Sequence, residues 1–240
     1  MNNNDFFKAQ VWYPILEKYT FPTKFVKLPQ EAIEMLATRK IDLASPVSLK
    51  VMELLKDPMD KTHGHCFIST DNCSLTDTER FATKRGAIHS PASAWRYLCE
   101  SKKVALEARK GEVTNICIKP YRNLTRAREF RLFIDNGQLV GASQYWMIRH
   151  YRRLVGIKDL YFQKMQDFVK EVAPLIPLEK YTLDIYFKSS LDIFIVDVNE
   201  WGAPTCPKLF NWDYDFTKST PELRLIKAPS KIKGDVNVSF

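Results

Sequence analysis

Two apolar strands joined by a short polar loop constrain this chain more than any other stretch of its sequence. Residues 181–187 (YTLDIYF) and 193–199 (IFIVDVN) are rich in β-branched and aromatic residues, and the residues between them are polar. Such a pattern predicts an antiparallel β-hairpin. If its loop is the four residues 189–192, then Lys188 pairs with Ile193 and Asp184 lies opposite Asp197.

Three oxygen-bearing side chains fall on this hairpin. Alternate residues of a strand share a face, so Asp197 and Asn199 are expected to point the same way, with Ile193 and Ile195 behind them on that face. Asp184 would join them from the facing strand. The hairpin is therefore expected to bring two carboxylates and one amide into one patch.

This patch has two interpretations. Opposed carboxylates on a sheet repel each other unless a cation lies between them. Oxygen donors with one amide suit Mg²⁺, a hard ion that keeps waters and substrate phosphates as its remaining ligands. Simple alternation on a half-buried sheet would also place Asp and Asn on a solvent-facing side. The pattern alone leaves both interpretations open.

Length and composition indicate a globular protein. The 240 residues allow one large domain or two closely packed lobes, and 45% of them are hydrophobic and 27% charged. No apolar run approaches the roughly 18 residues that span a membrane, and the start MNNNDFFK lacks the apolar core of a signal peptide. We therefore expect a soluble, cytoplasmic protein with no membrane partner.

The five cysteines are scattered and include no CxxC pair. An odd number without paired spacing favours reduced thiols over a disulfide framework. The stretch His63-Gly64-His65-Cys66 could hold a soft metal, but no second ligand cluster follows at zinc spacing. A loop that enters a strand explains the same residues.

Basic residues outnumber acidic ones, with 36 Lys and Arg against 28 Asp and Glu and a net charge of +8. They cluster in residues 119–131 and 149–153. A basic face of this kind attracts phosphates, RNA or an acidic protein partner. A net charge of this size also keeps a protein soluble without any partner.

The rest of the chain supplies elements that would flank the hairpin. Asn136-Gly137 between two apolar runs predicts a second hairpin, because both turn positions need positive φ. On its first strand Glu129 and Arg131 share one face, and apolar residues occupy the other. Helices are predicted over residues 5–19, 30–38, 48–56, 76–83, 90–108 and 158–174, and further strands over 23–28, 65–70 and 115–121.

Antiparallel strands with covering helices predict an α+β fold. No Gly-rich phosphate loop of the Walker or kinase type is present, so those nucleotide-binding folds are disfavoured. An acidic floor of Asp184, Asp197 and Asn199 with Arg131 beside it could hold a nucleoside triphosphate through Mg²⁺. The strand at 115–121 would be a hinge. We expect an N-terminal and small lobe over residues 1–114 and a C-terminal lobe over 115–240.

Several short motifs resemble one known family. EFRLF at 129–133, LDIY at 183–186, VDVNEWG at 196–202 and LFNW at 209–212 occur in the order and spacing of the ATP-grasp domain of the cell division cycle protein 123 (D-one-two-three) family. The similarity continues upstream through TDTERFATKRGAIHSPASAW and reaches WYPILEKYTFPTKFVKLP near the start. It therefore covers nearly the whole chain.

The resemblance implies an ATP-grasp fold of two lobes, with an antiparallel sheet as the floor of a nucleotide cleft between them. It also implies ATP and Mg²⁺ as cofactors. By position, the metal ligands would be Asp184, Asp197 and Asn199; the catalytic residues would be Arg131 and Asp197, with Glu129 orienting Arg131 toward phosphate; and Lys119, Pro120 and Tyr121 would be the hinge that lines the adenine.

This chain departs from the family pattern in its first lobe. The family places basic phosphate-binding residues on the strand where this chain has Ser69, and near Ile88. Lys84 and Arg85, just before Ile88, could supply that charge instead. Glu200 stands where the family commonly has a proline. These departures concern ATP turnover rather than the fold.

Functions of different classes follow from the resemblance. As an enzyme, the protein would be an ATP-dependent ligase that acts on a macromolecular substrate, RNA or protein, and this is the working hypothesis. As a binding protein, it would resemble the eukaryotic members of the family, which are assembly chaperones for translation initiation factor 2 and bind ATP without needing turnover. A third alternative is an ATP-grasp domain that has lost catalysis together with its first-lobe basic residues.

Overall fold

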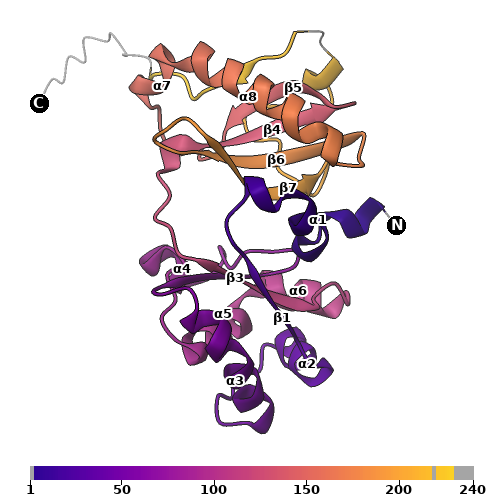
Figure 1. Cartoon of the computed structure of the whole chain (residues 1–240), viewed down its shortest axis with the longest axis vertical. Coiled ribbons are helices and arrows are strands. Elements are labelled where there is room, and N and C mark those ends of the chain that lie inside the picture. The colour runs from indigo at the N-terminus through magenta and orange to yellow at the C-terminus, as the bar shows by residue number, and fades with distance from the viewer. Residues whose placement is uncertain (1–2, 218–219, 230–240) are drawn as a thin grey trace, which may run out of the picture.

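Two lobes, each with its own β-sheet, make up the computed structural model of this chain, which describes residues 3–217 and 220–229 (Figure 1). The lobes are stacked along the long axis of the molecule, and each is built around a separate hydrophobic core. The α+β class and the two-lobe arrangement expected from the sequence are therefore confirmed.

The small lobe is a three-stranded antiparallel sheet covered on one face by helices. Its strands lie in the order β1 (Lys24–Lys27), β3 (Asn115–Pro120), β2 (Cys66–Thr70). The helices are α2 (Gln30–Thr38), α3 (Pro46–Asp60), α4 (Glu79–Lys84), α5 (Pro91–Glu100) and α6 (Lys102–Arg109).

Alternation along β2 and β3 separates a core face from a cleft face. Ile68 and Ile118 point into the core beneath the helices, where Trp95 is fully buried. Ser69 and Lys119, the next residues along each strand, face the large lobe. The small sheet therefore forms the roof of the space between the lobes.

The large lobe is a five-stranded sheet that is antiparallel except at one edge. The strand order is β7 (Ile193–Glu200), β6 (Lys180–Phe187), β4 (Glu129–Asp135), β5 (Gln138–Gln144), β8 (Leu223–Arg224), and β8 pairs with β5 in parallel. The helices α7 (Arg152–Gly156) and α8 (Lys158–Val172) follow β5, and short 3₁₀ turns lie at Arg126–Arg128, Ala173–Leu175 and Asp215–Thr217.

The two faces of this large sheet have different environments. Leu132 and Leu183 pack with Met165 of α8, which lies across the outer face. The inner face carries Arg131 and Asp184, paired directly across β4 and β6. Because the outer face is sealed by a helix, the polar groups of the inner face are directed toward the small lobe.

An aromatic cluster covers the rest of the inner face. Phe133 lies at its centre, with ring centroids 4.8 to 6.2 Å from those of four rings contributed by the segment after β7. Those rings belong to Trp201, Phe210, Trp212 and Phe216. Their packing folds the segment back onto the sheet that precedes it.

The N-terminal segment joins the large lobe rather than the small one. It comprises a 3₁₀ turn (Asn3–Phe7), α1 (Ala9–Leu16) and a second 3₁₀ turn (Glu17–Tyr19), and Trp12 and Leu16 belong to the core of the large lobe. Conversely, β3 is the central strand of the small sheet. The division into residues 1–114 and 115–240 stays a prediction. Strand pairing and core packing both cross this boundary. Residues 230–240 of the second range lie outside the described part.

A β-bulge shifts the central hairpin relative to the predicted register. Phe187, not Lys188, pairs with Ile193, and the predicted opposition of Asp184 and Asp197 is nevertheless confirmed. One extra residue, Val196, is inserted between the two pairings, which restores the register. The bulge also reverses the alternation, so Ile193 and Ile195 lie in the core on the opposite face from Asp197, and their predicted shared face is wrong.

Residues 90–108 form two helices rather than the single predicted one. The chain breaks at Ser101, which has an extended backbone and accepts a hydrogen bond from the Val104 N–H as the cap of α6. Asp77 holds the break, since its carboxylate accepts from the Ser101 hydroxyl and from two backbone N–H groups. Among the described helices, none combines the length and apolar content that crossing a membrane requires.

The aromatic cluster gives a stability prediction at Gly141. This glycine pairs with Phe133, and a Cβ added to it would lie 3.0 Å from two ring atoms of Phe210. We expect Gly141→Ala to lower the free energy of unfolding by about 1–2 kcal/mol, because the ring must move within a packed cluster. Urea denaturation followed by tryptophan fluorescence measures the change.

Gly156→Ala is the matched control, because the added Cβ would meet nothing within 4 Å. It is exposed at the end of α7, where alanine should leave stability unchanged or raise it by up to about 1 kcal/mol. Equal or greater stability of Gly141→Ala than of the wild type would contradict the tight packing described for the cluster.

Candidate functional site

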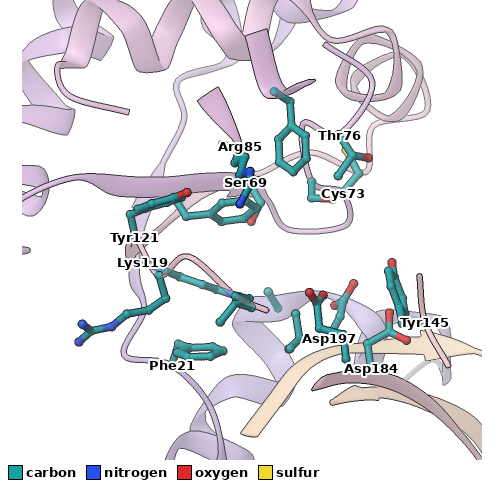
Figure 2. Close-up of a pocket in the computed structure, with 18 of the residues that line it drawn as sticks. Phe21, Ser69, Cys73, Thr76, Arg85, Lys119, Tyr121, Tyr145, Asp184 and Asp197 are labelled. Atoms are coloured by element: carbon teal, nitrogen blue, oxygen red, sulfur yellow. The ribbon is translucent and has the colours of Figure 1, made fainter. Parts of the chain in front are cut away.

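A cleft of about 410 Å³ lies between the lobes and is lined by both of them. Figure 2 shows Ser69, Cys73 and Thr76 on the roof side and Asp184 and Asp197 on the floor side. The cleft is therefore bounded by the inner face of each sheet. Its position follows from the alternation that sends apolar residues to the outer cores.

The floor is organised by a buried ion pair. Arg131 donates from Nε and Nη2 to the two carboxylate oxygens of Asp184, both at 2.7 Å, and from Nη1 to the Cys206 carbonyl at 2.7 Å. Arg131 and Asp184 are each only 5% exposed. Burial by itself lowers the pKa of Arg131, but the Asp184 carboxylate more than offsets this and holds the pKa above its ordinary value.

This geometry changes the role expected for Arg131. Each of the three guanidinium nitrogens of Arg131 donates a hydrogen bond within the protein. Arg131 therefore fixes both Asp184 and the chain at Cys206. Asp184, rather than Glu129, orients Arg131. Glu129 lies one pleat along β4 and lines the cleft, where burial and the nearby Asp184 charge raise the pKa of its carboxyl.

The second carboxylate of the floor lacks such a partner. Asp197 lies opposite Asp184, and among the described residues its only hydrogen bond comes from the Val198 N–H at 3.0 Å. Although Asp197 is partly open to the cleft, desolvation and the Asp184 charge raise its pKa to about 7. Lys119, from the roof, opposes this shift.

Asn199 completes the predicted set. Its side-chain N–H₂ donates to Asp184 Oδ2 at 3.2 Å, so the amide oxygen is turned away from that carboxylate. The described residues contain no group of three or more His, Cys, Asp or Glu that could hold a metal. Two carboxylates and an amide nevertheless fit Mg²⁺, which binds through one or two protein carboxylates and keeps waters and phosphates.

The roof above the acidic pair is uncharged at the positions where the family has basic residues. Ser69 lines the cleft, whereas Ile88 is buried in the core of the small lobe and cannot reach it. Of the two basic residues just before Ile88, Arg85 lines the cleft and donates to Asn123 at 3.2 Å. Lys84 is exposed and is not part of the lining.

Lys119, Pro120 and Tyr121 line one end of the cleft, which we call the hinge end, and their contact with an adenine stays a prediction. The Tyr121 N–H donates to the His65 carbonyl at 2.8 Å, so this donor is not available to a ligand. Phe21 lies below them on the floor side, as Figure 2 shows. The aromatic side chains make this end suited to a planar, partly apolar group.

Two residues beside the acidic pair, Tyr145 and Lys208, could not be identified as site residues from the sequence. Tyr145 lines the cleft, and Asp184 and burial raise the pKa of its hydroxyl. The Lys208 ammonium lies 3.6 Å from the centroid of the Tyr145 ring. Lys208 follows a proline in an irregular loop, and only the tertiary contact of that loop with β4 and β5 brings it to the floor.

Comparisons with known proteins were made for the sequence and for the fold. The family model described as D123 matches residues 95–239. The translation initiation factor eIF2 assembly protein of Vanderwaltozyma polyspora is 26% identical over 133 residues, 50% of this chain and 36% of that protein. The protein of the same name from Lodderomyces elongisporus is 30% identical over 130 residues, 51% of this chain and 33% of that protein.

The chain thus spans about a third of the length of the curated relatives it matches. Among solved structures, that of Cdc123 from Schizosaccharomyces pombe is similar at a TM-score of 0.82 and 19% identity, with 94% of this chain and 97% of that chain covered. At this identity the likeness shows the fold. The two-lobed α+β fold expected from the sequence is thereby confirmed.

The raised pKa of Asp197 predicts a pH-dependent stability. Because its folded pKa of about 7 exceeds the ordinary value of 3.8, this carboxyl favours the folded state below pH 4, and the contribution is lost as the pH rises through 7. Asp197→Asn keeps the acceptor for the Val198 N–H and removes the charge. At pH 8 without Mg²⁺, we expect the free energy of unfolding of the variant to exceed that of the wild type by at least about 1 kcal/mol.

Chemical denaturation at pH 5 and pH 8, with a chelator present, measures this difference. The other titrating groups are common to both proteins, so the change of the difference with pH isolates Asp197. The gap between variant and wild type should shrink toward pH 5. An equal difference in the free energy of unfolding at both pH values would show that ionisation of Asp197 does not destabilise the folded state.

Proposed function

The chain belongs to the D123 family, and from that premise we propose that it is an Mg²⁺–ATP-binding assembly factor for a subunit of translation initiation factor 2. The observation that supports nucleotide binding is the floor of the cleft, where Asp184, held by Arg131, faces the carboxyl of Asp197, whose one hydrogen bond among the described residues comes from the Val198 N–H. Two adjacent carboxylates in a partly desolvated cleft are a site for a divalent cation.

In this proposal the metal ligands are Asp184, Asp197 and Asn199. Bound Mg²⁺ would neutralise the two carboxylates and screen the phosphate charge. Arg131 is a positioning residue, because its guanidinium holds Asp184 and does not project into the cleft. The base and ribose would occupy the hinge end, near Lys119 and Tyr121.

An assembly role accounts for the relatives better than a ligase does. Several of them are named as translation initiation factor eIF2 assembly proteins. The ligase hypothesis rests on the fold, and one fold serves many functions. Because the chain spans about a third of those relatives, an initiation factor subunit as partner is part of the proposal. We place this activity in the cytoplasm, as the sequence predicts.

One surface of the large lobe suits a protein partner. Residues 147–155 combine exposed apolar side chains, Met147, Ile148 and Val155, with exposed Arg149, Arg152 and Arg153. Methionine and arginine are enriched at protein interfaces, and an RNA site would instead be expected to present exposed aromatic rings for base stacking. We therefore favour an acidic protein over RNA as the macromolecule that this surface binds.

Nucleotide binding is tested by isothermal titration calorimetry with Mg²⁺ and ATP. We expect the wild type to bind, and both Asp197→Ala and removal of Mg²⁺ with a chelator to weaken binding at least about tenfold, since each removes part of the metal site. Asp192→Ala is the matched control. Asp192 is on the exposed loop of the same hairpin and does not line the cleft, so its loss should leave binding unchanged.

The nucleotide-binding part of the proposal would be ruled out if the wild type gave no binding heat with ATP and if ATP did not displace a fluorescent nucleotide from it. Equal binding by wild type and Asp197→Ala would instead remove Asp197 from the metal site while leaving nucleotide binding in place.

Partner binding is tested with purified initiation factor 2 subunits on an affinity resin, with and without Mg²⁺–ATP. We expect one subunit to be retained, more strongly with nucleotide, and Arg152→Glu with Arg153→Glu to reduce retention at least about tenfold by reversing charge at the contact. Lys50→Glu, on the exposed face of α3, is the control.

Release of ADP or AMP should stay below one equivalent during the same experiment. Sustained turnover that depends on an acceptor molecule would favour the ligase instead. Retention of no subunit, with nucleotide binding intact, would remove the assembly role and leave the nucleotide site standing.

A further inference from the structure

A short loop over the sheet floor holds Lys208 in a fixed position. Residues 203–210 pack on the inner face of the large sheet, and two hydrogen bonds anchor them. Arg131 Nη1 donates to the Cys206 carbonyl at 2.7 Å, and the Leu209 N–H donates to Ser143 Oγ at 3.2 Å. Lys208 lies between these anchors, so the buried ion pair that organises the floor also sets its position.

The backbone of Lys208 adopts a left-handed conformation, with φ 58°. This region is disfavoured for a residue with a Cβ and is retained only where the surroundings enforce it. Here the anchors on both sides supply that constraint. The conformation directs the side chain across the ring of Tyr145, which itself lines the cleft.

The ammonium of Lys208 has an incomplete set of partners. It lies 3.6 Å from the centre of the Tyr145 ring, and no described residue gives it a hydrogen bond or an ion pair. Arg131 approaches the same ring, at 5.5 Å. Burial, followed by the Arg131 charge, lowers the pKa of Lys208. An anion that accepted hydrogen bonds from this ammonium would remove both penalties.

Lys208 does not itself line the cleft but lies against Tyr145, which does. In Figure 2, Tyr145 lies beside Asp184, on the side away from Tyr121 and Phe21. A nucleotide whose base lies at the hinge end would therefore extend its phosphates past Asp197 and Asp184 toward Tyr145. The last phosphate would meet the Lys208 side of the floor, below a roof that is neutral at Ser69, Cys73 and Thr76.

The basic residues that line the cleft come from the small lobe and from the segment after β3. Arg85 donates to Asn123, and Arg122 and Arg126 belong to the same segment after β3. Lys119 projects from β3 itself. Arg126 reaches the ring of Trp146, at 4.7 Å from its centroid, next to Tyr145. Of the described residues, Lys208 and Arg131 are the cations that approach the Tyr145 ring itself, and Arg131 is engaged with Asp184 and the Cys206 carbonyl.

We propose that Lys208 binds the terminal phosphate of a nucleoside triphosphate and makes the cleft select triphosphates over diphosphates. The inference rests on the proposed Mg²⁺–nucleotide binding and adds its specificity. An ammonium and a phosphate form a short, charge-assisted hydrogen bond. With Mg²⁺ on the Asp197 side and Lys208 on the Tyr145 side, the terminal phosphate would be held from two directions.

Calorimetry with ATP, ADP and AMP, each with Mg²⁺, tests this role. For Lys208→Asn, which tolerates a left-handed backbone but carries no charge, we expect the ATP dissociation constant to rise about tenfold and the ADP and AMP constants less than about twofold. Lys208→Arg keeps the charge and should restore part of the ATP preference. Lys50→Asn, a charge removed from the exposed face of α3, should change none of the three.

Three outcomes would overturn the inference. Lys208→Asn with wild-type affinity for ATP shows that the ammonium does not meet the phosphate. Equal weakening of ATP, ADP and AMP shows that Lys208 supports the cleft as a whole through Tyr145. Wild-type protein that binds no nucleotide removes the proposed function as well, and this result is distinguishable because the other two require measurable wild-type binding.

Discussion

The inner face of the large sheet depends on the buried pair of Arg131 and Asp184. A single carboxylate joins β4 to β6 through two charge-assisted hydrogen bonds and receives a third from Asn199 on β7. The same guanidinium fixes the loop at Cys206. Removing one member of such a pair would leave a buried charge uncompensated, which typically costs about 3–5 kcal/mol. The pair therefore specifies the register of three strands and the path of the segment that follows them.

The consequence is an uneven division of charge on the floor. Asp184 is compensated within the protein, whereas Asp197 faces it with one backbone hydrogen bond and a raised pKa. A floor in which every charge had a partner within the protein would be more stable without a ligand, but it would leave no charged group to bind one. Among the described residues, neither Asp197 nor Lys208 has an ion-pair partner, and their charges differ in sign. A cation bound at the first and an anion bound at the second would complete the floor together.

Much of this floor could be predicted from the sequence, and the failures have identifiable causes. Alternation within β4 and β6 placed Arg131 and Asp184 on one face correctly, because both strands are regular there. In β7 the same rule failed for Ile193 and Ile195, because a bulge is set by tertiary packing and leaves no mark on an apolar run. Lys208 and Tyr145 could not be found at all. Their contact depends on how the loop returns to the sheet.

The arrangement of the two cores gives a physical reason for a nucleotide to act as a structural element. The N-terminal helix belongs to the large lobe, whereas β3, which leads directly into that lobe, belongs to the small sheet, so the chain crosses between the lobes more than once. Direct contacts already join the lobes, since the Ala9 N–H donates to the Asp71 carbonyl at 3.0 Å and the Gln10 side chain donates to Thr114 Oγ1 at 3.2 Å. Within the cleft, Lys119 from the roof lies near the floor carboxylate Asp197. A ligand that binds only when both surfaces are in place stabilises that arrangement in proportion to its concentration and affinity. Binding would then add to these contacts in fixing the relative positions of the lobes, and the proposed assembly role would need no chemical step on the nucleotide.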